Sequence, residues 1–302
     1  MAESVLISGG SGLVGKVLTT LLIEKGYKVG HISRSASSNP NVETIVWDLK
    51  KKTIDIEQVK KYDYLINLVG AGIADKKWTE ERKEEIVRSR VESLNFLFNI
   101  TKEHNLPFKS AVSASAVGYY GFNTSDHIYN ETDPPSEDFL GNTCQKWEKA
   151  LFQFNEINIP ASAVRIGLVL STEGGALKEL AFPIKLYAGA PLGNGKQYMP
   201  WVHIRDICNQ FIFQMEHKLK GSYNGCADEH VTNKEFTEAV AQVLKKPLIL
   251  PNVPAFVMKV ILGQRSLMVL NGSRVSNEKI KKAGFKYDFS KLNSALQELY
   301  NG

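Results

Sequence analysis

A glycine-rich turn near the start of the chain carries the clearest chemical signal in the sequence. Its glycines are three residues apart, follow a short apolar run at residues 5–7 and open an amphipathic stretch over about residues 12–26. Glycines so placed let the backbone turn tightly, approach a pyrophosphate and pack a helix against a strand, while the amino end of that helix attracts the anion. We therefore predict a dinucleotide site here, with contacts from Gly9, Gly12, Leu13, Val14 and Gly15.

The end of the next apolar run, residues 29–32, indicates which dinucleotide binds. An acidic residue at this point would bind the ribose 2′-hydroxyl, whereas a cation accommodates a 2′-phosphate. The sequence places Ser33 and Arg34 there, without a carboxylate. These two residues favour NADP(H) as the cofactor. The competing interpretation is an arginine in a surface loop, because residues 33–40 have the composition of a loop.

The elements that must position this site follow an alternating pattern. Short apolar runs alternate with longer amphipathic stretches through the first half of the chain, which predicts an α/β fold with a Rossmann-like, doubly wound parallel sheet. After Ile166, glycines and prolines break this rhythm, and we expect a smaller C-terminal substrate lobe. The predicted strands span residues 5–7, 29–32, 44–47, 64–69, 111–113 and 161–166, and the predicted helices span residues 12–26, 79–104, 141–157, 206–217 and 232–244.

The composition is that of a soluble globular protein. The 302 residues are 43% hydrophobic, and the net charge of +5 is scattered in short lysine pairs, unlike the basic stripe of a nucleic-acid-binding surface. Three cysteines without C-x-x-C spacing fit reduced thiols, and no basic leader, long apolar segment or metal-ligand spacing is present. We expect a cytoplasmic protein with a small-molecule substrate and without metal, nucleic-acid or membrane partners. A homodimer is compatible with the sequence.

Further motifs run from one end of the chain to the other, at residues 47–49, 67–72, 78–91, 113–121, 165–170, 201–206, 250–254 and 272–275. Together with the glycine turn, they resemble the extended short-chain dehydrogenase/reductase family, and more narrowly its NAD(P)-dependent epimerase-like subgroup that ends in a domain of unknown function. The resemblance implies an NAD(P)-binding epimerase/dehydratase domain at residues 1–245, of which 168–205 and 219–235 contribute to the substrate lobe. Residues 246–302 would form the C-terminal part of that lobe.

The resemblance also implies further contacts with the cofactor. Asp48 and Leu49 would approach the adenine, and the segment after the 64–69 strand would line the path to the nicotinamide ribose. Two arginines would face the same cleft. Each polar residue has a competing structural role, because Asp48 could cap the following turn and either arginine could form a surface ion pair. The remaining implied contacts are Leu68, Gly70, Ala71, Arg90 and Arg165.

Catalysis in the family that the chain resembles uses Ser, Tyr and Lys, with Tyr-x-x-x-Lys on one helical turn. The tyrosine moves a proton to or from the substrate oxygen, and the lysine lowers its pKa. Ser115 matches the serine, with Ser113 as the fallback. However, Cys144 stands at the tyrosine position and Glu148 at the lysine position, and the chain has Tyr-x-x-x-Lys only at residues 287–291, in the C-terminal segment.

Three interpretations of the proton donor stay open. Cys144 could be the acid or base, although the carboxylate of Glu148 four residues later would raise the pKa of its thiol. Tyr119 or Tyr120 could supply a phenol instead. Cys144 could also be a buried apolar residue in a protein that binds the cofactor without turnover.

Two functions follow from these alternatives. The first is an NADP(H)-binding oxidoreductase or sugar-nucleotide epimerase/dehydratase-like enzyme, which works by hydride transfer with Ser115 polarising the substrate oxygen. The second is a non-catalytic NADP(H)-binding sensor or assembly protein.

Overall fold

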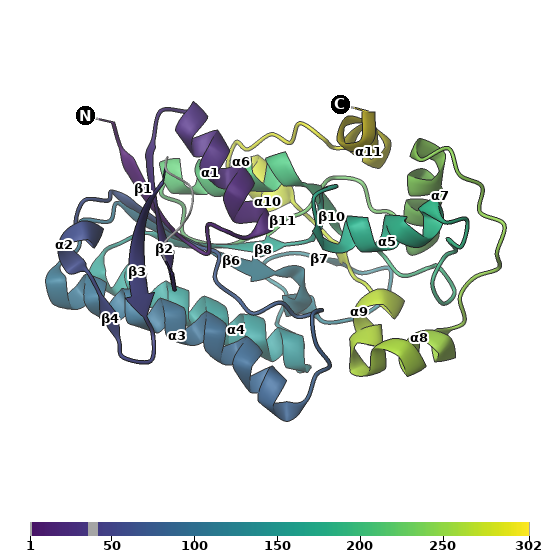
Figure 1. Cartoon of the computed structure of the whole chain (residues 1–302), viewed down its shortest axis with the longest axis horizontal. Helices are drawn as coiled ribbons and strands as arrows, with labels where there is room; N and C mark the ends of the chain where they lie inside the picture. Colours follow the sequence, from purple (N-terminus) through teal and green to yellow (C-terminus); the bar gives the residue numbers. More distant parts are fainter. Residues whose placement is uncertain (1, 36–41, 302) are drawn as a thin grey trace.

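A computed structural model describes residues 2–35 and 42–301 of the chain, and its centre is a large twisted sheet (Figure 1). Within these residues, eight strands pair in the order β11-β8-β6-β5-β1-β2-β3-β4, and all pairs are parallel except β3 with β4. This arrangement confirms the predicted Rossmann-like sheet. The strands are β1 (Ser4–Ser8), β2 (Lys28–Ser33), β3 (Glu43–Asp48), β4 (Thr53–Ile54), β5 (Tyr64–Asn67), β6 (Ser110–Ala116), β8 (Ala161–Ile166) and β11 (Gly221–Gly225).

Helices cover both faces of the sheet (Figure 1). On one face α1 (Leu13–Glu24) packs against α6 (Ile204–Glu216), and on the other α3 (Glu80–His104) packs against α4 (Phe139–Phe152). Every residue of β1 and β5 is buried, as expected for parallel strands enclosed by two helical layers. The short helices α2 (Ile56–Val59), η1 (Val117–Tyr120) and η2 (Gln153–Ile157) lie in the connections.

Side-chain caps fix where the helices α3 and α4 begin. The hydroxyl of Thr79 accepts a hydrogen bond from the backbone N–H of Arg82 at the start of α3. The carboxylate of Asp138 accepts one from the N–H of Gly141 at the start of α4. Such caps satisfy N–H groups that have no partner inside the helix, and each contributes about 1 kcal/mol to helix stability. Because the cap fixes where α4 begins, it also fixes the direction in which each side chain after Gly141 leaves the helix.

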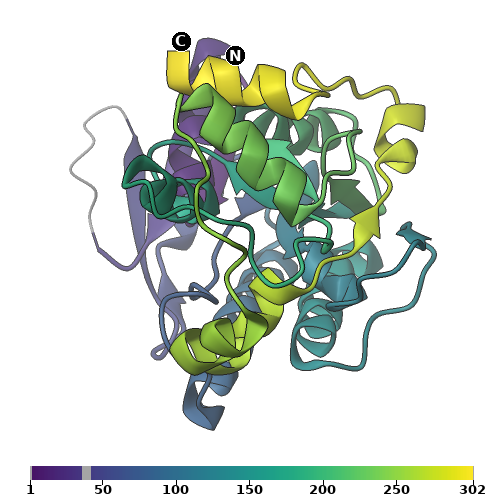
Figure 2. The same ribbon diagram turned by 90° about the vertical axis from the view of Figure 1, so that its right-hand side faces the viewer.

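The second half of the chain builds a smaller lobe with its own core (Figure 2). Trp201 and Phe236 are fully buried there, together with apolar residues of α5, α7 and α11. The elements of this half are β9 (Leu168–Leu170), α5 (Gly175–Lys185), β10 (Trp201–His203), α7 (Asn233–Val243), α8 (Ala255–Leu262), η3 (Gly263–Ser266), α9 (Leu267–Leu270), β12 (Arg274–Val275), which pairs with β7 (Ile128–Tyr129), α10 (Glu278–Lys282) and α11 (Leu292–Asn301).

Predicted and observed elements differ mainly after residue 166. The helices predicted at 206–217 and 232–244 are present as α6 and α7, whereas α5 and β11 were not predicted. The loop predicted at 33–40 lies mostly outside the described residues. No helix in the described part of the chain is long and apolar enough to cross a membrane.

Candidate functional site

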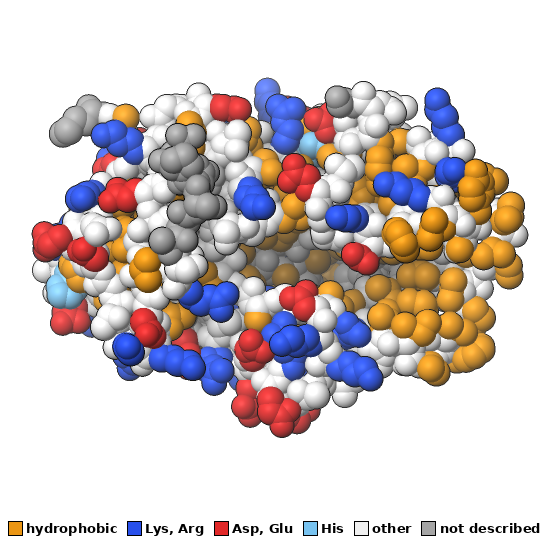
Figure 3. Space-filling model, viewed as in Figure 1, with side chains coloured by type: hydrophobic (Ala, Val, Ile, Leu, Met, Phe, Trp, Pro, Cys, Tyr) orange, Lys and Arg blue, Asp and Glu red, His pale blue; other side chains and the backbone are white. Residues whose placement is uncertain are grey.

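The strand order creates a crevice at the carboxyl ends of β1 and β5. The chain leaves β1 toward β2 on one side and later returns to β5 on the other, so the loops after these two strands diverge. Dinucleotides bind at such a switch point in doubly wound sheets. Here the backbone N–H of Leu68 donates to the carbonyl of Ser8 at 2.8 Å, which joins the two loops at their origin. Figure 3 shows the surface hollowed near its centre, between the lobe that holds α5 and α8 and the rest of the molecule.

The glycines of the turn serve two different purposes. Gly9 has a φ of +82°, and a side chain on Gly10 would overlap the ring of His31. A Cβ on Gly15 would lie 2.6 Å from the carbonyl oxygen of Gly9, so the close approach of α1 to the turn requires a glycine. By contrast, a Cβ on Gly12 would meet only that same carbonyl, at 3.4 Å. The packing therefore leaves Gly12, the first residue before α1, with an open side where an anion can approach the amino end of the helix.

The ring of His31 packs against this turn. The hydroxyl of Thr19 donates to the carbonyl of Gly15 at 2.7 Å, so it must accept the hydrogen bond that joins it to Nε2 of His31 at 2.8 Å. This bond assigns the proton of the imidazole to Nε2. Burial lowers the pKa of His31, which keeps the ring neutral beneath the turn.

The residues predicted to select the cofactor lie at the ends of β2 and β3. Ser33 ends β2 and is half-buried, and Arg34 follows it and is exposed. Asp48 ends β3, where its carboxylate accepts hydrogen bonds from the backbone N–H groups of Lys50 and Lys51 at 2.9 and 3.1 Å. These bonds lower the pKa of Asp48 and give it the turn-capping role that the sequence left open. Leu49 packs, half-buried, against the main core.

Arg90 anchors the loop after β5. From α3 its guanidinium donates to the carbonyl of Ala71 at 3.0 Å, stacks over Trp147 at 4.9 Å and occupies the space where Gly70 would carry a side chain. Burial lowers its pKa to about 10. Arg90 therefore fixes the shape of the loop that includes Gly70 and Ala71, rather than forming a surface ion pair.

A buried acid–base network lies at the carboxyl end of β6. The carboxylate of Glu148, on α4, accepts bonds from Nε and Nη2 of Arg165 at 2.8 and 2.9 Å. It also accepts the hydroxyl protons of Ser115 and Ser222, each at 2.7 Å. Glu148 is 5% exposed and Arg165 is 3% exposed, so the pair is almost completely removed from water. Burial alone would lower the pKa of Arg165, but the bonds and charge of Glu148 raise it overall.

The two candidate serines have different partners. Ser113 is fully buried and bonds to Asn67, whose amide in turn accepts the hydroxyl proton of Ser8, so Ser113 links the three central strands. Ser115 is two residues closer to the crevice, but it gives its only hydroxyl proton to Glu148. Ser115 is 2% exposed, and in this arrangement its hydroxyl can act toward any further group only as an acceptor.

Cys144 lies on the buried face of α4, one turn before Glu148. The residue is 4% exposed, and burial together with the Glu148 carboxylate raises the pKa of its thiol to about 12. At neutral pH the group is therefore a neutral thiol. Within the described residues, Cys208 and Cys226 are also buried and none of the three cysteines forms a disulfide.

The two candidate tyrosines in η1 make contrasting contacts with Arg165. Its guanidinium carbon lies 3.4 Å from the centre of the Tyr119 ring, so the cation covers one face of this half-buried phenol. Tyr120 is buried, accepts from Nη1 of Arg165 at 2.8 Å and donates to the amide oxygen of Asn224 at 2.7 Å. Burial raises the pKa of Tyr119, with Arg165 opposing the change. Of the two phenols, Tyr119 is the one that a substrate could reach.

Comparisons with known proteins agree with this architecture. Residues 5–146 match the NAD dependent epimerase/dehydratase family, and residues 253–299 match a domain of unknown function, DUF1731. The epimerase family protein YfhF of Bacillus subtilis (strain 168) is 30% identical over 98% of this chain and 97% of its own length. The chain belongs to this epimerase family.

Solved structures extend the likeness of this epimerase-family chain to the whole fold. The crystal structure of human epimerase family protein SDR39U1 (isoform2) with NADPH matches with a TM-score of 0.86 and 29% identity, covering 99% of each chain. UDP-N-acetylglucosamine 4-epimerase from Methanobrevibacter ruminantium M1, in complex with UDP-N-acetylmuramic acid, matches with a TM-score of 0.79 over 100% of this chain and 98% of its own. At 20% identity, the second likeness shows the shared fold alone.

The Tyr-x-x-x-Lys sequence of the epimerase-family chain lies apart from the crevice. The hydroxyl of Tyr287 donates to the amide oxygen of Gln210 at 3.0 Å, and Nζ of the exposed Lys291 lies 3.7 Å from Glu229. Residues 287–291 are not helical, so the two side chains do not share a helical face. The described residues contain no group of side chains that could hold a metal ion.

Two features of the site were not predicted from the sequence: the pairing of Glu148 with Arg165 and the contact of His31 with the turn. A signal for the first was present in α4, because Glu148 falls on the same helical face as the buried Leu140, Cys144 and Leu151. A carboxylate on an apolar face requires a buried cation or several donors. The partners themselves could not be read from the sequence.

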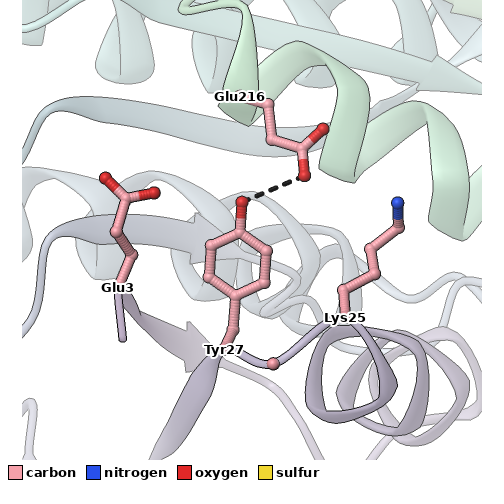
Figure 4. A pocket seen from close by; sticks show the side chains of 5 residues that line it. Glu3, Lys25, Tyr27 and Glu216 are labelled. Atoms are coloured by element: carbon pink, nitrogen blue, oxygen red, sulfur yellow. Dashed lines mark hydrogen bonds between the residues drawn. The ribbon is translucent and has the colours of Figure 1, made fainter. Parts of the chain in front are cut away.

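A pocket at the opposite edge of the sheet is not part of this site. It is lined by Glu3, Lys25, Gly26, Tyr27 and Glu216, and the Tyr27 hydroxyl donates to Glu216 at 3.0 Å (Figure 4). These residues lie beside the amino ends of β1 and β2. Cofactors of doubly wound sheets bind at the carboxyl ends, on the other side.

Proposed function

We propose that this epimerase-family protein binds NADP(H) at the Gly9–Gly15 turn and uses it for hydride transfer between a carbonyl carbon and an alcohol carbon. The observation that carries the proposal is the open side of Gly12 at the amino end of α1, in a turn whose other glycines are held by close packing. A pyrophosphate fits this position because helix N–H groups and the helix dipole face it. The human relative SDR39U1 was solved with NADPH, which supports the same cofactor class.

The residues around the crevice fit the rest of the cofactor. Arg34 is exposed at the end of β2, where a cation would meet a 2′-phosphate, and Ser33 would add a hydroxyl. Asp48 and Leu49 would lie beside the adenine. The nicotinamide half would follow the loop after β5, whose shape Arg90 fixes through Ala71. In this proposal, Arg90 and Arg165 act by positioning other groups, and the remaining contacts are Gly9, Gly12, Leu13, Val14, Gly15, Leu68, Gly70 and Ala71.

The cofactor supplies the hydride, and the chain must supply the proton. We assign this role to Tyr119, because it is half-buried, lies in η1 directly after the strand that carries Ser115, and is covered by the Arg165 guanidinium. The raised pKa keeps its phenol protonated at neutral pH, so it acts as an acid toward a carbonyl oxygen. The guanidinium then stabilises the phenolate that forms. The cation that the wider family takes from a lysine on the helix would here come from β8.

Ser115 and Cys144 have smaller parts in this mechanism. Because its hydroxyl donates to Glu148, Ser115 would accept a hydrogen bond from a substrate hydroxyl and so orient the alcohol product. Cys144 is a buried neutral thiol, which makes it part of the packing between α4 and β6 rather than an acid or base. We expect a small carbonyl or sugar-nucleotide substrate, since epimerases of the same fold bind such ligands.

A second candidate function is a sensor that binds NADP(H) without turnover. It is favoured by the same network, because the hydroxyl proton of Ser115 is already donated to Glu148. The two functions differ in the fate of the cofactor. Nicotinamide absorbance at 340 nm would be followed with NADPH and a panel of carbonyl compounds, and with NADP⁺ and a panel of sugar nucleotides. Oxidation of NADPH or reduction of NADP⁺ that is lost in Tyr119→Phe and kept in the remote control Tyr27→Phe supports the enzyme, whereas tight cofactor binding without a change of redox state on either panel supports the sensor.

A further inference from the structure

The end of the molecule formed by α5 and α8 exposes an unusual amount of apolar surface. Of the twelve large apolar side chains exposed in the described residues, nine lie in the segments 182–187 and 249–267. Phe256 is 68% exposed and Val260 is 82% exposed. Figures 1 and 2 place α5 and α8 at the same end, away from β4, and Figure 3 shows apolar side chains gathered there. We name these nine residues the apolar end: Phe182, Leu186, Tyr187, Ile249, Leu250, Phe256, Val260, Ile261 and Leu267.

The charges in the α8 half of the apolar end have one sign, whereas α5 carries the exposed Glu179 as well as Lys185. Between Glu238 and Glu278 the sequence contains five Lys or Arg residues and no Asp or Glu. Lys259 is exposed on α8 between Phe256 and Val260, and Lys185 is exposed on α5 among the apolar residues 182–187. Lysines interspersed with large apolar side chains are typical of surfaces that lie on anionic lipid bilayers.

The apolar end is held in place by the fold. Val253, just before α8, exchanges backbone hydrogen bonds with Pro191 and Gly193 at 2.9 and 2.8 Å. Nζ of Lys246 donates to the Tyr187 hydroxyl at 2.8 Å, which joins the end of α5 to the segment that leads into α8. The exposed side chains of both helices therefore stand on a fixed support and can meet a surface together.

From this combination we propose that the apolar end docks on the surface of an anionic lipid bilayer, with Phe256 and Val260 entering the boundary between headgroups and acyl chains. Lys185 and Lys259 would pair with the lipid phosphates. The proposal concerns attachment to one leaflet, without any spanning segment. The sequence predicted no membrane partner because it has no long apolar run, and a surface built from two separated segments gives no such signal.

A second copy of the chain fits the same surface less well. In a symmetric dimer the two copies would present the same patch to each other. Lys185 and Lys259 of both copies would then lie in one contact, and like charges in a contact from which water is excluded oppose association. An anionic leaflet instead neutralises these lysines while it buries the apolar side chains.

The test is cosedimentation of the full chain with large unilamellar vesicles. Vesicles of phosphatidylcholine with one-third phosphatidylglycerol are compared with pure phosphatidylcholine, at low and at high salt. We expect binding to the anionic vesicles that weakens in high salt and is much lower on neutral vesicles. Phe256→Ser with Val260→Ser is expected to weaken binding at least tenfold, since two exposed apolar side chains lose their contact with the bilayer. Lys185→Gln with Lys259→Gln is expected to weaken it by roughly fivefold for each lysine.

A matched control tests whether vesicle binding depends on the apolar end itself. Ile23→Ser with Ile128→Ser replaces two other exposed apolar side chains, which lie on α1 and β7, and should leave vesicle binding unchanged. All variants change exposed side chains, so equal thermal midpoints confirm that each is folded. Three results would overturn the proposal: no binding to either vesicle, binding that survives the change at Phe256 and Val260, or a dimer that this same change abolishes. The outcome is independent of the proposed NADP(H) chemistry.

Discussion

The Glu148 carboxylate accepts a hydrogen bond from the hydroxyl of Ser115 at 2.7 Å, so Ser115 has no proton left to donate to another group in the candidate site. Glu148 stands where the wider family would place a lysine, so the charge at this position is reversed. The compensating cation is Arg165 on β8, with 2.8 Å between Nε and the carboxylate. The site therefore keeps a buried cation, and in the proposed mechanism that cation acts through Tyr119 rather than from α4.

Replacing Glu148 tests how much the fold depends on this pair. Glu148→Gln leaves the buried guanidinium of Arg165 without a counter-charge, and we expect a loss of about 3 to 5 kcal/mol in the free energy of unfolding. Urea denaturation followed by circular dichroism measures it. Glu156→Gln, an exposed change close to the end of the same helix, should stay within about 0.5 kcal/mol of the wild type. Equal stabilities of the two variants would show that the ion pair contributes little.

The thiol of Cys144 gives a prediction about pH. Its pKa is raised from 9.0 to about 12 in the folded state, so the folded protein holds this proton more tightly than the unfolded chain. The resulting stability is complete below pH 9 and is lost as the pH rises from about 9 to 12. Cys144→Ala should therefore show a smaller loss of stability than the wild type over this interval. Iodoacetamide at pH 8 should leave Cys144 unmodified in the folded protein and modify it in urea.

Local patterns were sufficient to predict the fold of the first half. The runs that became β1, β5 and β8 are apolar and short, and the intervening helices carry a clear apolar face, so burial and periodicity agree. The strand β11 was missed because Gly221–Gly225 begins and ends with glycine and carries Ser222 and Asn224. Its pairing with β8 depends on the rest of the sheet.

The site was less predictable because its contacts join distant parts of the chain. Ser115 and Arg165 are neighbours only because β6 pairs with β8 in the register that places them side by side. Ser222 reaches Glu148 from β11, 74 residues later. Which of these side chains share hydrogen bonds depends on the register of three strands, and that register could not be read from the sequence.

Substitutions at two glycines of the turn test helix packing and cofactor binding separately. Gly15→Ala would push a Cβ to 2.6 Å from the Gly9 carbonyl, and we expect a loss of about 1 to 3 kcal/mol in stability together with the loss of NADPH binding. Gly12→Ala meets the same carbonyl at 3.4 Å, so stability should change by less than about 1 kcal/mol while NADPH affinity falls at least tenfold. Thermal melts and fluorescence titration with NADPH distinguish the two. Unchanged NADPH affinity in Gly12→Ala would place the pyrophosphate elsewhere.

Arg34 should decide between the two nicotinamide cofactors. Arg34→Ala removes the cation proposed for the 2′-phosphate, so the affinity for NADPH should fall by about tenfold or more while that for NADH stays the same. Lys51→Ala, which removes an exposed cation in the turn after β3, is the matched control and should change neither affinity. If the wild type binds NADH as tightly as NADPH and Arg34→Ala alters neither, the assignment to NADP(H) is wrong.

Tyr119 provides the last test, because a proton donor and a packing residue give different kinetics. Tyr119→Phe keeps the ring over the Arg165 guanidinium and removes only the hydroxyl. NADPH affinity and thermal stability should stay close to wild type, while kcat for carbonyl reduction falls at least a hundredfold. In the wild type, reduction should decline at alkaline pH as the phenol loses its proton, above the ordinary tyrosine value of 10.0 because burial raises the pKa of Tyr119. Arg165→Lys should change this alkaline limb, since a shorter and differently shaped cation no longer covers the ring. An unchanged kcat in Tyr119→Phe would assign the proton to another group.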